Sequence, residues 1–111
     1  MESPIIAHNK GDVLVFESVE LAEQYLEPID VVNGEYAIYD SRGRRINGVI
    51  VTHRGVEHVR LEPASDSGGA ADELRRVLVA FLTHALNVPD GGLHESSLED
   101  LVKAAQQFKT K

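Results

Sequence analysis

The chain has 111 residues, of which 42% are hydrophobic and 26% charged, and this composition is typical of one folded domain spanning residues 1–111. Eighteen acidic against eleven basic residues give a net charge of −7, which argues against nucleic acid as the main partner. There is no cysteine, so disulfides, thiolate nucleophiles and cysteine-bound metal centres are excluded. The longest apolar run, Val77–Leu82, is far below the roughly 20 residues of a membrane span. The N-terminus lacks a secretory signal, so we expect a cytoplasmic protein without a membrane partner.

The first part of the chain predicts a strand followed by a helix. Val13–Phe16 is a short apolar run, typical of a buried strand. Ser18 has the position of an N-cap, and Pro28 disfavours helical geometry before it, so the helix should end near Leu26 or Glu27. The apolar face of this helix is expected to consist of Leu21, Ala22, Tyr25 and Leu26.

After Pro28 the pattern changes to the alternation of strands. Asn33 and Gly34 mark a turn before an alternating segment at 35–40, and Asp40–Gly43 suits a tight turn into the next strand. Arg45–His53 and Val56–Glu62 then predict a hairpin joined at residues 54–55. In that register Ile50, Val59 and Leu61 share the face that is the better core candidate.

The last part of the chain predicts two amphipathic helices. Pro63–Gly69 has the composition of a linker, and the residues at 88–92 should end the first helix. Ser97, followed by Asp100, resembles a capping box at the start of the second. The apolar positions are Leu74, Val77, Leu78, Phe81, Leu82, Ala85 and Leu86 in the first helix, and Leu98, Leu101, Val102, Ala105 and Phe108 in the second, with Lys109 and Lys111 at its C-terminal end.

This order of elements, β-α-β-β-β-α-α, predicts a fold of the α+β class. We expect a single domain with an antiparallel sheet of about four strands and helices packed on one face. The linker does not divide two domains, because neither half of the chain has enough apolar surface to fold alone.

The residues that could carry chemistry do not form a complete site. Of the five histidines (His8, His53, His58, His84 and His94), only His53 and His58 approach each other, as diagonal neighbours on the hairpin, and a zinc site needs further ligands. The serines fall at caps and in loops, and no nucleophile-elbow, phosphate-loop or dinucleotide motif occurs. The sequence therefore predicts no catalytic residue, no cofactor and no metal.

The distribution of charge is the least random feature of the sequence. No basic residue occurs between Lys10 and Arg42, whereas the next stretch is rich in arginine. One interpretation is a solvated acidic helix face, folded against the basic hairpin. The other is an anionic patch that attracts a basic protein partner, and the acids expected in or beside that interface are Glu20, Glu23, Glu27 and Asp30. The three glutamates are expected to share one exposed helical face.

The run VFESVELAEQYLEPIDVVNGEYAIYDSRGRR (Val15–Arg45) resembles a pattern in small bacterial proteins. In size, acidity and α+β layout, the chain resembles the immunity proteins of contact-dependent inhibition and other polymorphic toxin systems. The resemblance implies a cytoplasmic protein that binds and blocks one toxin domain, often a nuclease with a basic surface. Such a protein needs neither a cofactor nor an active site.

The leading hypothesis is therefore a non-enzymatic protein-binding module, an immunity protein that neutralises the C-terminal domain of a cognate toxin. One alternative is a small structural or adaptor protein whose helical stripe packs in a homodimer. Another is a small enzyme of a class that its sequence does not reveal.

Overall fold

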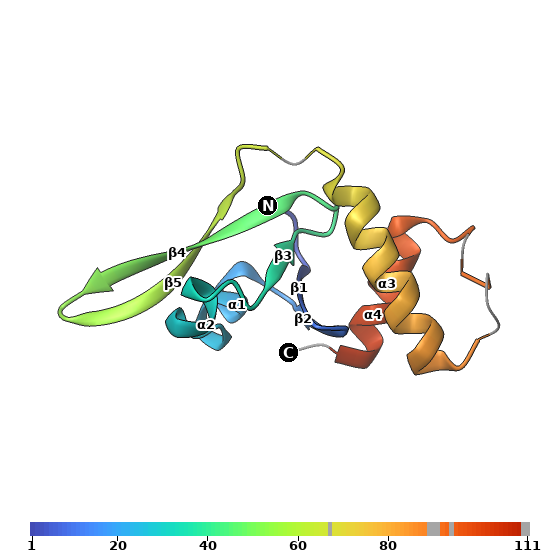
Figure 1. Ribbon diagram of the computed structural model, residues 1–111, viewed down its shortest axis with the longest axis horizontal. Helices are drawn as coiled ribbons and strands as arrows, with labels where there is room; N and C mark the ends of the chain where they lie inside the picture. Colours follow the sequence, from blue (N-terminus) through green and yellow to red (C-terminus); the bar gives the residue numbers. More distant parts are fainter. Residues whose placement is uncertain (67, 89–91, 94, 110–111) are drawn as a thin grey trace.

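The structure is a computed structural model that describes residues 1–66, 68–88, 92–93 and 95–109 (Figure 1). Within these ranges the chain forms five strands and four helices, in the order β1 (Ile5–Asn9), β2 (Asp12–Phe16), α1 (Val19–Tyr25), α2 (Pro28–Val32), β3 (Ala37–Tyr39), β4 (Arg45–His53), β5 (Val56–Pro63), α3 (Ala70–Leu86) and α4 (Leu98–Lys109). The strands form one sheet in the order β2-β1-β3-β4-β5, and every neighbouring pair is antiparallel. The predicted α+β class is confirmed, with five strands rather than about four.

The additional strand is β1, which lies between β2 and β3 in the sheet. It pairs with β2 through a tight turn at Lys10 and Gly11, both of which have positive φ (49° and 87°). Such a turn matches the twist of the two strands it joins. Only the first three residues of β1, Ile5–Ala7, are apolar and buried, so the strand has little local signal and depends on its two neighbours.

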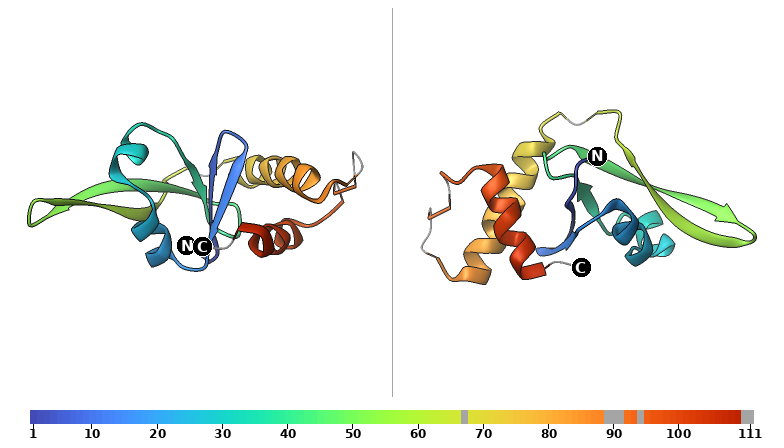
Figure 2. Two further views of the ribbon diagram at one scale, coloured as in Figure 1. Left: turned by 90° about the horizontal axis from the view of Figure 1, so that it is seen from below. Right: turned by 180° about the vertical axis from the view of Figure 1, so that it is seen from behind.

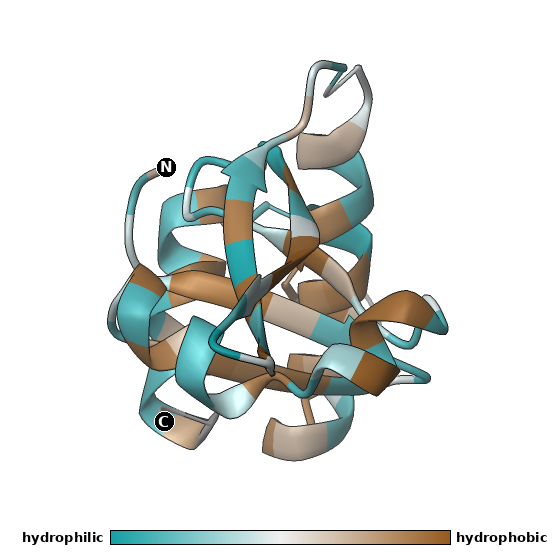
Figure 3. Cartoon of the chain, turned by 90° about the vertical axis from the view of Figure 1, so that its left-hand side faces the viewer, coloured by the Kyte–Doolittle hydropathy of each residue, from teal (hydrophilic) through white to brown (hydrophobic). Residues whose placement is uncertain are grey.

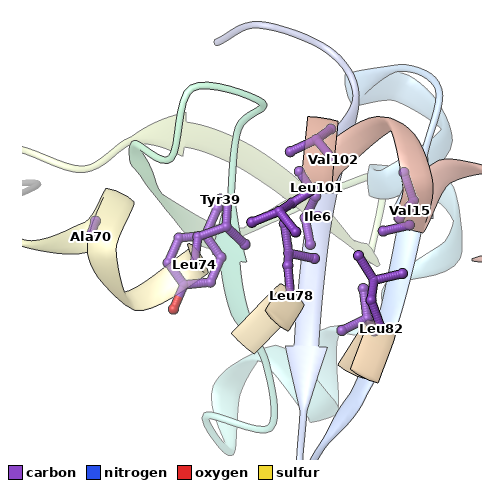
Figure 4. Close-up of a cluster of buried hydrophobic side chains, with 11 residues drawn as sticks. Ile6, Val15, Tyr39, Ala70, Leu74, Leu78, Leu82, Leu101 and Val102 are labelled. Atoms are coloured by element: carbon purple, nitrogen blue, oxygen red, sulfur yellow. The ribbon is translucent and has the colours of Figure 1, made fainter. Parts of the chain in front are cut away.

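Helices cover both faces of the sheet, so the expectation that they gather on one face is wrong (Figure 2). Because successive strand residues point to opposite faces, Val13 and Val15 pack under α3 and α4, whereas Leu14 and Phe16 pack on the side of α1 and α2. Figure 4 shows Leu74, Leu78 and Leu82 of α3 meeting the first of these faces, together with Ile6, Val15, Tyr39, Leu101 and Val102.

The hairpin of β4 and β5 projects from the body of the molecule, whose dimensions are 51 × 25 × 22 Å (Figure 1). The predicted register is confirmed: Ile50 lies opposite Val59, and both Val59 and Leu61 are buried. Helix α2 packs on this hairpin at Gly48, where a Cβ atom would lie 2.7 Å from a methyl carbon of Val31. Glycine is therefore needed at this position for the helix to approach the strand.

The helix boundaries agree with most of the predicted signals. Helix α1 ends at Tyr25, and Pro28 then begins α2, a short helix that the sequence analysis does not predict. Helix α3 ends at Leu86 with Asn87 in the left-handed conformation, while residues 89–91 of the expected break lie outside the described residues. The Lys109 side chain and Lys111 likewise lie outside them. None of the helices in the described ranges has the length and hydrophobicity to cross a membrane.

Candidate protein-binding surface

Helices α1 and α2 place the predicted acids at the end of the molecule that carries the projecting hairpin. Ser18 caps α1 as expected, because its Oγ accepts a hydrogen bond from the Leu21 N–H at 3.1 Å. Leu26 and Glu27 are extended, so the chain changes direction before α2 begins. Glu20 and Glu27 are exposed, and Asp30 is half-buried in the first turn of α2.

Glu23 differs from the other predicted acids because it binds the sheet. Its Oε2 accepts a hydrogen bond from the backbone N–H of Leu61 at 2.7 Å. Leu61 belongs to β5, the outermost strand of the sheet, whose outward N–H groups lack a strand neighbour. The expectation that Glu20, Glu23 and Glu27 share one exposed helical face is therefore wrong, since Glu23 faces β5 and Glu27 lies beyond the end of α1.

Large apolar side chains are exposed on the same two helices. Leu21 is 40% exposed, Tyr25 48%, Ile29 65% and Val32 70%. They are four of the eight large hydrophobic side chains found exposed in the described ranges, which is a concentration typical of a contact surface. Of the apolar face predicted from the sequence, only Ala22 and Leu26 are buried. We define the α1–α2 surface as Glu20, Leu21, Tyr25, Glu27, Ile29, Asp30 and Val32.

Figure 3 looks at this end of the molecule and shows hydrophobic and hydrophilic segments interleaved on the ribbon that faces the viewer. The Tyr25 ring packs against the buried Phe16 ring, with 5.4 Å between the ring centroids. The ring thus contacts the core, while about half of the residue remains accessible. An aromatic residue held in this way loses little conformational freedom when a partner covers it.

The electrostatic environment of Tyr36 indicates that acids converge near this surface. Burial raises the pKa of the Tyr36 phenol, and the next causes are the neighbouring groups Asp30, Tyr25, Glu35 and Asp12. The three carboxylates come from α2, from the loop before β3 and from β2. Asp30 of the α1–α2 surface therefore has Glu35 and Asp12 as acidic neighbours around the Tyr36 hydroxyl.

The described ion pairs of the arginines at 42–60 do not involve Glu20, Glu27 or Asp30. Arg42 pairs with Glu2 at 2.7 Å, and Arg60 pairs with Glu62 at 2.9 Å within β5. Within the described residues, no ion pair joins a cation to Glu20, Glu27 or Asp30. Helices α1 and α2 pack against the hairpin of β4 and β5, but this packing includes no described ion pair between its arginines and Glu20, Glu27 or Asp30.

The histidines do not converge in the described part of the chain. His53 and His58 are diagonal neighbours on an exposed face of the hairpin, as the predicted register requires. Across the described ranges, no three histidine or acidic side chains gather in a way that would hold a metal ion. His94 lies outside those ranges.

Two buried polar side chains, Asp40 and Tyr39, have hydrogen-bond partners that give them a structural role. The buried Asp40 carboxylate accepts hydrogen bonds from the backbone N–H groups of Glu2, Arg42 and Arg44 and from the Arg44 side chain. The Tyr39 hydroxyl donates to Glu73 at 2.7 Å, which joins β3 to the first turn of α3. Burial and this hydrogen bond raise the pKa of Tyr39.

Sequence reasoning did not identify these clusters as structural centres. The local signal for Asp40 was its position at the start of a turn, followed four residues later by Arg44. The partnership of Tyr39 with Glu73 spans 34 residues and has no local signal.

The α1–α2 surface thus combines exposed apolar side chains with acids that have no ion-pair partner among the described residues. The chain matches no protein-family model, and neither a curated protein nor a solved structure matches it.

Proposed function

We propose that the chain is a non-enzymatic protein-binding module whose α1–α2 surface binds a basic protein. The observation that carries this proposal is the placement of exposed Leu21, Ile29 and Val32 beside acids for which the described part of the chain provides no ion-pair partner. In its specific form, the protein is a cytoplasmic immunity protein that neutralises the C-terminal domain of a cognate toxin. The resemblance of Val15–Arg45 to small bacterial proteins supports this form.

The two kinds of side chain have different roles in such an interface. Apolar side chains that become buried supply binding free energy, at about 25 cal/mol per Å² of apolar surface. Acids at the rim raise the rate of encounter with a positively charged partner. A second copy of this chain fits less well at this surface, because its own acids would face those of the first copy.

The test uses the protein encoded by the gene immediately upstream of the gene for this chain, and specifically its C-terminal domain. We expect that domain to arrest growth when it is expressed alone, and co-expression of this protein to restore growth. The purified proteins should form a stable complex. A metabolic enzyme encoded at that position, or a basic toxin domain that forms no complex with the chain, would refute the proposal.

A matched pair of variants locates the interface. Val32→Asp places a charge on the α1–α2 surface and should abolish binding, whereas Val56→Asp changes a comparably exposed valine, 54% accessible, on the hairpin and should leave binding intact. Both side chains are exposed, so both variants should fold. Equal binding by the two variants would exclude the α1–α2 surface as the interface.

A further inference from the structure

A groove of about 690 Å³ lies between the β1–β2 turn and helix α3, outside the α1–α2 surface. The turn contributes His8 and Lys10, and the helix contributes Arg76, Val77, Phe81 and His84. This volume is within the range of sites that bind small molecules, roughly 300–1,000 Å³.

Local structure accounts for the two walls. The His8 Nε2 accepts a hydrogen bond from the Gly11 N–H at 3.1 Å, which ties one wall of the groove to the tight turn. On α3, the buried Leu78 and Leu82 face the sheet, whereas Val77 and Phe81 are partly buried and form the apolar part of the other wall. Residues 77, 81 and 84 follow the i, i+4, i+7 spacing of one helical face.

The groove holds two cations that have no ion-pair partner among the described residues. Several arginine and lysine side chains of this net acidic protein form ion pairs, but Lys10 and Arg76 pair with no acid among the residues that the structure describes. One carboxylate, Asp12, also lines the groove, so two full positive charges face one negative charge before either imidazole is counted. The two imidazoles add ring N–H groups, which can donate hydrogen bonds.

From this arrangement we infer that the groove binds a small organic anion, a carboxylate or phosphate ester with a flat apolar body. The anionic group lies against Lys10 and Arg76, where charge-assisted hydrogen bonds are strongest. The apolar body lies on Val77 and Phe81, where it removes their remaining exposed surface from water. This inference does not depend on the proposed function, because the groove and the α1–α2 surface are made by different elements.

The test is an NMR titration of the full chain, observed through its backbone amides. The probes are 2-naphthoate and 1-naphthyl phosphate, with uncharged 2-naphthalenemethanol and inorganic phosphate as controls. We expect saturable shifts at Gly11 and along residues 76–81 for both aromatic anions, with much weaker effects from each control. The absence of saturable shifts up to about 5 mM probe, or equal binding of a control compound, would overturn the inference.

Substitutions of Lys10 and Arg76 test whether these two cations bind the anion. Lys10→Gln and Arg76→Gln should each weaken binding of 2-naphthoate about 3- to 10-fold. The matched control is Arg54→Gln on the hairpin, which removes another exposed cation without a described ion pair and should leave the affinity unchanged. All three side chains are exposed, so the amide spectra should remain those of the folded protein. An equal loss of affinity in all three variants would mean that only the net charge of the protein matters, and would overturn the assignment of the groove.

Discussion

The Asp40 carboxylate and the Arg44 guanidinium lie 2.7 Å apart, yet the aspartate side chain is 1% exposed and the arginine side chain 53%. The charge that is removed from water is therefore the acid, and backbone N–H groups of Glu2 and Arg42 complete its hydrogen bonding. This single carboxylate joins the N-terminal segment to the β3–β4 turn.

Replacing the buried carboxylate should be strongly destabilising. Asp40→Asn removes charge-assisted hydrogen bonds and introduces N–H groups where donors already converge, so we expect a loss of about 2–4 kcal/mol in the free energy of unfolding. Urea denaturation at neutral pH measures it. The comparison is Glu2→Gln, which breaks only the exposed pair with Arg42 and should cost less than about 1 kcal/mol. Similar losses in the two variants would contradict this account.

The same group should contribute to acid denaturation. Burial alone would raise the Asp40 pKa, but hydrogen bonds from Arg44 and Glu2 outweigh it and hold the pKa below its usual value of 3.8. Because the folded pKa is the lower one, the stabilisation is complete above the unfolded pKa and is lost as the pH falls through the folded pKa. The stability difference between wild type and Asp40→Asn, measured from neutral pH downward, should be constant at first and shrink below about pH 4. A stability difference that grows as the pH falls would contradict a lowered pKa of Asp40.

The contact between α2 and β4 should be sensitive to one methyl group. Gly48→Ala would place a Cβ 2.7 Å from a Val31 methyl carbon, so overpacking should cost about 1–3 kcal/mol. Val31→Ala removes that methyl carbon, and the double variant should lose less stability than the sum of the single variants. Strictly additive losses of stability in this double-mutant cycle would mean that the contact between residues 48 and 31 does not cause the destabilisation.

Truncations along α3 should separate the core from the groove. Leu78 is fully buried, so Leu78→Ala should cost about 2–5 kcal/mol, and a domain of this size could then unfold. Phe81 is only partly buried, so Phe81→Ala should cost less, although the sequence pattern places both residues mid-stripe. Thermal and urea unfolding of the two variants test the order. A larger loss of stability for Phe81→Ala than for Leu78→Ala would mean that Phe81 belongs to the core and not to the accessible wall of the groove.

The hairpin of β4 and β5 could be predicted almost to the residue, because its alternation and its two-residue turn are local signals. The helical spacing of apolar residues likewise predicts which side chains of α1 lie on one face, but it does not predict which of them the sheet covers. Leu21 and Tyr25 follow the helical pattern and are nevertheless exposed. Helix α2 could not be predicted either, because Pro28 disfavours helical geometry before it and equally suits the first position of a new helix.

The candidate surface was predictable in part for a related reason. The base-free segment showed that acids would gather, and Glu20, Glu27 and Asp30 do lie on or between the two helices. Glu23 could not be separated from them in sequence, since its partner Leu61 is 38 residues away on a strand edge. Neither pattern nor charge indicates which acid a tertiary hydrogen bond will use.

If the proposed function is correct, the acids of the α1–α2 surface should change the rate of association with the proposed toxin partner. Glu20→Lys combined with Glu27→Lys should slow association and weaken its salt dependence, with little change in dissociation or in folding stability. Glu23→Lys should instead destabilise the fold by about 1–3 kcal/mol, because the Leu61 N–H loses its acceptor. Stopped-flow mixing at low and high salt measures the first effect, and urea denaturation the second.

Glu57→Lys is the matched control for these reversals, since it changes an exposed acid on the projecting hairpin and leaves the α1–α2 surface intact. It alters the net charge by two units, as each single reversal at Glu20 or Glu27 does, so any general effect of net charge appears in it as well. A surface that steers the partner requires a clearly larger loss of association rate per substitution at Glu20 and Glu27. If Glu57→Lys slows association as much as they do, only the overall charge matters. If no reversal changes association at either salt concentration, the interface lies elsewhere, and the arginine-bearing hairpin becomes the next surface to test.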